Sequence, residues 1–166
     1  MAEALFVRTK DLKEFSVLSG NLDEDKVKQY IKIAQDTHLE QYLGTDLKQR
    51  LQAGIIADDL TSNETSLLDT YVKPMTIHWA LVEYLGFAAY TIADKGVYKH
   101  FSENSETVTK SEIDALVERH RNIAEMYTDR FHRYMCYNKD LFPEYDSNTD
   151  EDINPINPQP FSGWQL

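Results

Sequence analysis

The sequence predicts an all-α protein: a small bundle of about four to five helices, with a short extended segment before it and an extended, acidic, proline-rich arm after it. Three observations predict this class. Apolar residues recur at helical spacing over long stretches of the chain. The 42% hydrophobic content is enough for one core. Four of the five prolines follow Asn138, where they prevent a helix from continuing. We therefore divide the chain into a bundle at 1–137 and an arm at 138–166.

The first elements are short. Residues 4–8 are an apolar run that we expect to be extended, and residues 9–18 can form a short helix. A clear amphipathic helix follows, with Asn21 or Asp23 as its N-terminal cap. Gly44 is its expected C-terminal stop, because glycine readily adopts the backbone conformation that ends a helix.

The middle of the chain predicts the central helix. Thr45 is expected to cap a short helix that Gly54 ends. From about Thr65 the helical pattern returns, and Pro74 either kinks one long helix or marks the first turn of a new one. Beyond it, apolar residues as far as Ile92 cover nearly every face, which is typical of a helix surrounded by others.

The last long helix has a clear start. The segment 97–109 reads as a loop or irregular hairpin, and Thr109 and Glu112 then form a capping box. An apolar stripe runs from Ile113 to Tyr134, and Asn138 is the expected end. The other faces carry charged residues.

Charge excludes two classes of partner. The formal net charge is −11, and the arm alone holds six acidic residues against one lysine. This balance argues against a nucleic-acid-binding face and against docking on anionic lipid. The most apolar window, 75–93, is interrupted by Glu83, which favours a buried core helix over a membrane span. The single cysteine, Cys136, cannot form an internal disulfide.

The sequence offers no catalytic constellation, cofactor motif or metal site. The spacings of a di-iron bundle, a zinc site and a phosphate-binding loop are absent. A partial calcium-loop pattern begins at Asp146 but lacks the required glycine and the final glutamate. His78 and His120 lie on apolar stripes, which favours hydrogen-bonded interior or interface histidines. We therefore expect that the protein is not an enzyme.

The arm carries apolar side chains that need burial somewhere. An acidic spacer is expected to stay extended, and proline lowers the cost of ordering a bound peptide. We predict that the arm docks in a groove of another subunit, although folding back over its own bundle remains an alternative. The predicted contact residues are Ile156, Pro158, Phe161, Trp164 and Leu166.

Three stretches resemble a known family. They read LDEDKVKQYIKIAQDTHLEQYLGTDL, YVKPMTIHWALVEYLGFAAYTIADKGV and EIDALVERHRNIAEMYTDRFHRYM. The pattern is similar to the head–tail connector, or adaptor, proteins of tailed bacteriophages. It looks closest to the ring proteins of crAss-like and other Bacteroidetes phages, and it spans roughly residues 5–137.

The resemblance implies a structural virion component at the head–tail junction, assembled in the host cytoplasm. Its partners would be a homo-oligomeric ring, commonly of twelve subunits, the portal protein and other neck or tail proteins. DNA would pass through the ring without specific binding. In such a ring the charged sides of the helix from Ile113 to Tyr134 would be candidate lateral contacts between subunits: Glu118, Arg119, Arg121, Asp129, Arg130 and Arg133. A second interpretation is a stand-alone acidic helical adaptor or inhibitor that binds a host protein.

Overall fold

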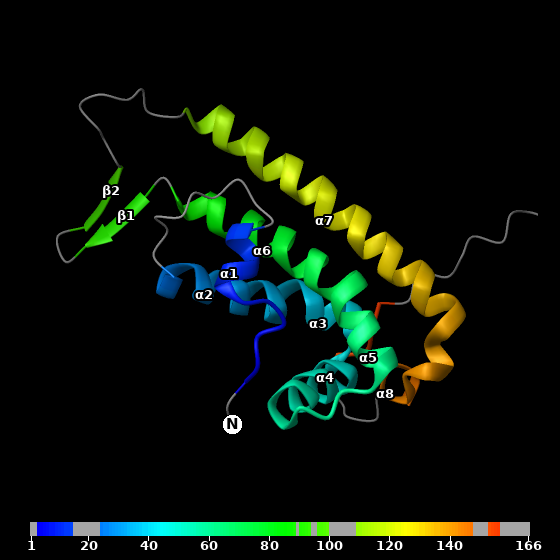
Figure 1. Cartoon of the computed structure of the whole chain (residues 1–166). Coiled ribbons are helices and arrows are strands. Elements are labelled where there is room, and N and C mark those ends of the chain that lie inside the picture. The colour runs from blue at the N-terminus through cyan, green and yellow to red at the C-terminus, as the bar shows by residue number, and fades with distance from the viewer. Residues whose placement is uncertain are drawn as a thin grey trace, which may run out of the picture.

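A computed structural model describes residues 3–14, 24–88, 90–93, 96–99, 109–147 and 153–156. Its framework is an antiparallel helix pair, α6 (Lys73–Ala88) and α7 (Lys110–Asn138) (Figure 1). In the sequence between these two helices, the strands β1 (Tyr90–Ala93) and β2 (Gly96–Lys99) form an antiparallel hairpin, with Tyr90 opposite Lys99 and Ala93 opposite Gly96. The all-α prediction is thus confirmed for a predominantly helical bundle, to which this hairpin is an addition.

A second helical layer covers the other side of α6. It consists of α2 (Glu24–Ala34), a π-helical turn η1 (Gln35–Leu39) and α3 (Glu40–Leu43), which Gly44 ends as predicted. The caps predicted at residues 21 and 23 lie outside the described residues. In this arrangement α6 has neighbours on both sides, which is why its pattern is apolar nearly all round.

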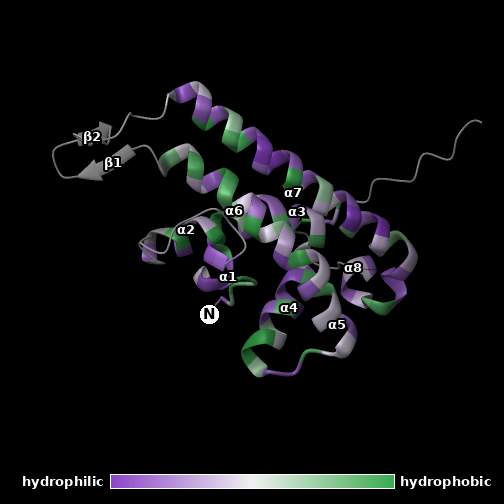
Figure 2. Ribbon diagram, turned by 45° about the horizontal axis from the view of Figure 1, so that its top comes forward, coloured by the Kyte–Doolittle hydropathy of each residue, from purple (hydrophilic) through white to green (hydrophobic). Residues whose placement is uncertain are grey.

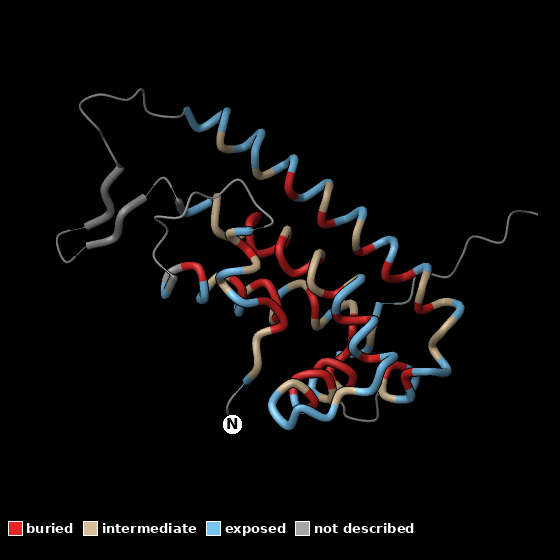
Figure 3. The backbone as a smooth tube through the Cα atoms, in the orientation of Figure 1, coloured by how far each residue is buried: buried red, intermediate tan, exposed pale blue. Residues whose placement is uncertain are grey.

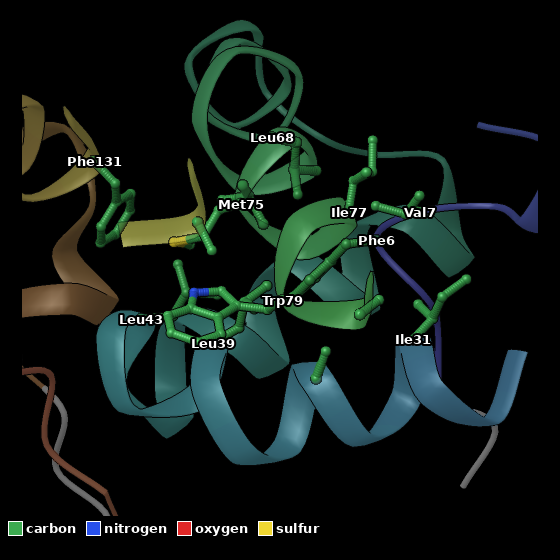
Figure 4. Close-up of a cluster of buried hydrophobic side chains, with 14 of the residues drawn as sticks. Phe6, Val7, Ile31, Leu39, Leu43, Leu68, Met75, Ile77, Trp79 and Phe131 are labelled. Carbon is green, nitrogen blue, oxygen red and sulfur yellow. The ribbon is translucent and has the colours of Figure 1, made fainter. Parts of the chain in front are cut away.

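The core lies between α6 and its two neighbours. Trp79 packs beside Leu39 and Leu43, while Phe131 approaches from α7 (Figure 4). The indole Nε1 of Trp79 donates a hydrogen bond of 3.3 Å to Thr128. Burial is concentrated on the inward side of each helix, and the outward side of α7 is exposed and hydrophilic (Figures 2 and 3).

The N-terminal segment is held against this framework before α1 (Thr9–Glu14) begins. The amide of Phe6 donates to Gln35 Oε1 at 2.7 Å, and the side chains of Gln35 and Gln52 both donate to the carbonyl of Ala4. Phe6 and Val7 are buried. The prediction of a non-helical segment at 4–8 is therefore confirmed, and residues 15–18 of the predicted short helix lie outside the described residues.

The expected central helix stops earlier than predicted. α6 ends at Ala88, and residues 90–93 form β1 instead of continuing the helix to Ile92. Their sequence, YTIA, is rich in the aromatic and β-branched residues that favour strands. The apolar count predicted burial here but could not separate a helix from a strand.

The short helix α4 (Thr45–Ala57) also differs from the prediction. Gly44, not Thr45, is its N-cap, and the helix runs through Gly54 to Ala57. The reason is local packing: a Cβ added at Gly54 would lie 2.4 Å from the side chain of Leu60, so this glycine lets Leu60, which follows α4, pack closely against the helix. The helix ends at Asp58, whose left-handed conformation has φ 56°.

The third helical stretch begins earlier than predicted. α5 (Ser62–Leu67) starts with a capping box in which Thr61 and Glu64 satisfy each other's backbone amides. A π-helical turn η2 (Leu68–Val72) joins it to α6. Pro74 therefore lies in the first turn of a new helix that is reached without a break in the helical path. This arrangement combines the two alternatives that the sequence left open.

The start of the predicted arm belongs to the bundle. Residues 139–147 form a 3₁₀ turn η3 (Lys139–Leu141) and a helix α8 (Pro143–Ser147) that packs on α4. Phe142 and Tyr145 are buried, so the predicted boundary at residue 137 is wrong. The boundaries of α7, with its capping box at Thr109, are confirmed.

Candidate interaction surface

The segment Ile153–Ile156 is tied to the turn between α3 and α4. Thr45 donates its amide to the carbonyl of Ile153 at 3.0 Å, and Ile153 donates its own amide to Thr45 Oγ1 at 3.1 Å. The amide of Ile156 donates to the carbonyl of Gln41 at 2.8 Å. These bonds fix the point from which residues 157–166 continue.

Gly44 makes this tether possible. Its backbone has φ 76° and ψ 161°, a conformation that side-chain-bearing residues rarely adopt. A Cβ added at Gly44 would lie 2.7 Å from the ring of Pro155. The glycine therefore both turns the chain between two helices and leaves room for the returning segment.

Of the predicted arm contacts, the structure places one. Ile156 is about half exposed, with its backbone engaged by the tether. Pro158, Phe161, Trp164 and Leu166 lie outside the described residues, so their docking stays a prediction.

The outward face of α7 carries all of the charged residues that the sequence predicts as lateral contacts. Arg133 donates to Asp129 at 2.7 Å within the helix, an exposed pair of little energetic weight. All six residues are exposed and lie along one long helix: Glu118, Arg119, Arg121, Asp129, Arg130 and Arg133. Their role as subunit contacts stays a prediction.

Arg130 has intrachain partners that the sequence did not predict. Its guanidinium lies over the rings of Tyr71 and Tyr127, at 5.9 Å and 5.7 Å from their centroids. Tyr71 stacks in turn on Tyr134 at 4.6 Å. The positive charge stays exposed at the surface, but its position is fixed by the rings on both sides.

The interface between α6 and α7, which we call the seam, contains two histidines. His78 stacks on Tyr127 at 5.6 Å, and its Nδ1 lies 3.2 Å from Nδ1 of His120. Burial, together with its histidine neighbour, lowers the pKa of His78 to about 4, and burial with nearby Arg119 lowers the pKa of His120. This contact confirms the prediction of interior hydrogen-bonded histidines. The described residues contain no group of three or more candidate metal ligands.

A groove lies beside this seam, which we call the seam groove. One hollow of about 430 Å³ is walled by Pro74, Ile77, His78 and Tyr127, and an adjoining hollow has a volume of about 290 Å³. Both are also lined by the same four charged residues, so the hollows meet there: Arg8, Asp11, Asp69 and Lys73.

The charged residues of the seam groove form two ion pairs. The guanidinium of Arg8 contacts both carboxylate oxygens of Asp11, and hydrogen bonding to Arg8 holds the Asp11 pKa below its usual value. Lys73 pairs with Asp69 one helical turn away. Sequence reasoning missed this site because its walls come from segments far apart in the chain, and a single proline inside a helical pattern was the one local signal.

A buried cation holds the α2–α4 region together. The ammonium group of Lys48 contacts Asp36 at 2.8 Å and Glu40 at 2.7 Å, and its side chain is 6% exposed. Burial lowers the Lys48 pKa, but these hydrogen bonds outweigh burial and raise it. Because the ammonium group of Lys48 is buried and paired with two carboxylates, we infer that Lys48 stabilises the fold.

Residues 39–154 match the sequence family DUF6712, a family of unknown function. The chain belongs to this family. The DUF6712 match runs past residue 137 and includes α8 and most of the bundle, and it ends inside the tether, before Pro155 and Ile156. Searches of curated proteins and of solved structures found no significant match. Among the described residues, no helix is long and apolar enough to cross a membrane.

Proposed function

We propose that this DUF6712 protein is a head-to-tail connector ring subunit of a tailed bacteriophage virion, attached to the portal and extending the DNA channel. The observation that carries the proposal is the tether. Hydrogen bonds at Thr45 and Gln41 deliver residues 157–166 from a fixed point on a folded bundle. A folded body with an aromatic-bearing segment of fixed origin suits a part that must join neighbours in a defined geometry.

The surface of α7 supports the same proposal. Acidic and basic side chains are interspersed on its exposed face from Lys110 to Arg133. A heterologous contact between two different faces of one subunit closes into a ring when the rotation between neighbours is right. The overall charge of −11 also fits a channel through which DNA slides without specific binding.

The decisive experiment is coexpression with the portal protein of the same phage genome, followed by native mass spectrometry and electron microscopy. The connector proposal predicts a cyclic complex of high order on the portal. A matched pair of variants tests the lateral face: Arg121→Glu weakens the ring, and Lys28→Glu, the same reversal of charge at an exposed position of α2, leaves it intact.

The competing function gives a different result. An acidic adaptor or inhibitor would stay a monomer or dimer and would bind basic partners with strong salt dependence. A subunit that remains monomeric beside its own portal, with binding lost at moderate salt, would refute the connector proposal.

A further inference from the structure

We propose that the seam groove binds residues 157–166 of a second copy of this chain. This inference rests on the proposed ring, because it names the surface on one subunit that receives the segment of the next. It commits to a head-to-tail contact in which every copy offers one groove and one segment.

The lining of the seam groove suits a proline-rich peptide. The hollow of about 430 Å³ has the rings of His78 and Tyr127 beside Pro74 and Ile77. Aromatic-lined grooves of this kind bind proline-rich segments in the polyproline II conformation. Half of the residues that line the adjoining hollow of about 290 Å³ are apolar: Leu5, Phe6, Ile55, Leu60 and Leu68.

The spacing of the two aromatic residues in the segment, Phe161 and Trp164, fits the two hollows. Residues 157–166 read NPQPFSGWQL. Prolines favour polyproline II, which has three residues per turn and rises about 3.1 Å per residue. Phe161 and Trp164 are three positions apart, so in this conformation they lie on one side at a separation of about 9 Å. Two rings one turn apart suit two hollows that share a rim.

The charges of the segment and of the groove are compatible. The segment 157–166 contains no Asp, Glu, Lys or Arg. The charged rim of the groove is paired within itself, Arg8 with Asp11 and Lys73 with Asp69. A peptide without charged side chains can therefore cover the groove without burying an uncompensated side-chain charge, which is the usual penalty at such interfaces.

The segment starts away from the groove of its own chain and is long enough to reach a neighbour. The tether holds Ile156 at Gln41, and none of residues 41–45 lines the groove. Ten residues in polyproline II span about 31 Å, which is enough to leave one small bundle and enter the next. Docking in the same chain would use both partners internally and would join nothing.

The experiment uses two full-length variants. In the segment variant, Phe161→Ala and Trp164→Ala remove both anchors. In the groove variant, Asp69→Tyr places a large ring at an exposed position on the rim of both hollows. Thr70→Tyr is the matched control, because it adds the same side chain at the next exposed position, outside the two linings. Melting curves followed by circular dichroism verify that all variants fold.

Analytical ultracentrifugation then measures association. We expect each of the two variants alone to self-associate at least about tenfold more weakly than the wild type, and the control to match the wild type. Mixing the two variants restores one intact contact, so a 1:1 complex forms and stops at two subunits. No complex in the mixture, or wild-type association by Asp69→Tyr, overturns the inference.

The remaining outcomes are also decisive. A wild type that stays monomeric indicates docking in the same chain, and overturns the inference, if its fluorescence minus that of the segment variant reports a buried Trp164; the subtraction removes the signal of buried Trp79. A groove variant that still forms a ring on the portal refutes the groove assignment and leaves the connector proposal intact. If the wild type does not associate with the portal, the connector proposal itself is refuted.

Discussion

Shortening the chain tests where the bundle ends. Phe142 is 1% exposed and Tyr145 is 4% exposed, and both pack from the segment that follows α7. Truncating one buried aromatic side chain to alanine costs about 3–5 kcal/mol. A chain that stops after Tyr137 loses both rings, so we expect it to lose at least about 5 kcal/mol of unfolding free energy. This equals the low end of the stability of whole domains, about 5–15 kcal/mol.

The assay is urea denaturation followed by circular dichroism. We expect a chain of residues 1–147 to unfold cooperatively, and a chain of residues 1–137 to show no cooperative transition at room temperature. In the full-length chain, Phe142→Ala should lower the unfolding free energy by about 4 kcal/mol with an unchanged slope.

The neighbouring position gives the matched control. Leu141 is 47% exposed, so Leu141→Ala should change stability by less than about 1 kcal/mol. The reasoning is refuted if the chain of residues 1–137 unfolds at the same urea concentration as the full-length protein, because η3 and α8 would then contribute nothing to the core.

Four further predictions concern single positions. Gly44→Ala should destabilise the protein by about 2–3 kcal/mol and speed hydrogen exchange at the amide of Ile156, and protection as in the wild type would contradict the tether. Lys48→Met should cost about 3 kcal/mol in urea denaturation, because Glu40 loses its cation and Asp36 keeps only Lys32; an unchanged midpoint would show that Lys48 is dispensable. Tyr145→Phe should raise stability by up to about 1 kcal/mol, since the buried hydroxyl has no hydrogen-bond partner among the described residues; a loss of stability would mean that the hydroxyl is bonded. His78 has a folded-state pKa near 4, below its unfolded value of 6.5, so its contribution is full above pH 6.5 and is lost as pH falls toward 4; melting temperatures of His78→Gln should fall less over this window, and parallel curves would refute the assignment.

The sequence predicted the long elements well because their signals are local and repeated. The capping box at Thr109 and the stripe from Ile113 to Tyr134 define α7 over many turns, and one glycine marks the end of α3. These features depend on residues a few positions apart. The structure confirms them with little change.

The short elements were predicted poorly for a physical reason. In α8 a proline in the first helical position and a buried tyrosine two residues later are surrounded by acidic residues, and five residues are too few to show a period. Thr61 and Glu64 did carry a readable signal, because their spacing is that of a capping box.

The candidate site was accessible from sequence only in part. Charged positions on α7 followed from periodicity, since a helical stripe has an opposite face. The seam groove did not, because Arg8, Asp69 and Tyr127 are brought together by tertiary packing. The placement of Arg130 between two tyrosines has the same origin.

The bonds between Thr45 and Ile153 join residues that lie 108 positions apart. During synthesis, Thr45 is made long before its partner, so α2, α4, α6 and α7 can pack while this contact is still missing. Contacts of large sequence separation form late, because closing the long loop costs entropy that earlier packing reduces. We therefore expect the tether to form late in folding. On that order a newly made chain holds the start of segment 157–166 at a fixed point only after its body has packed, which in the proposed ring would delay assembly until the subunit has folded.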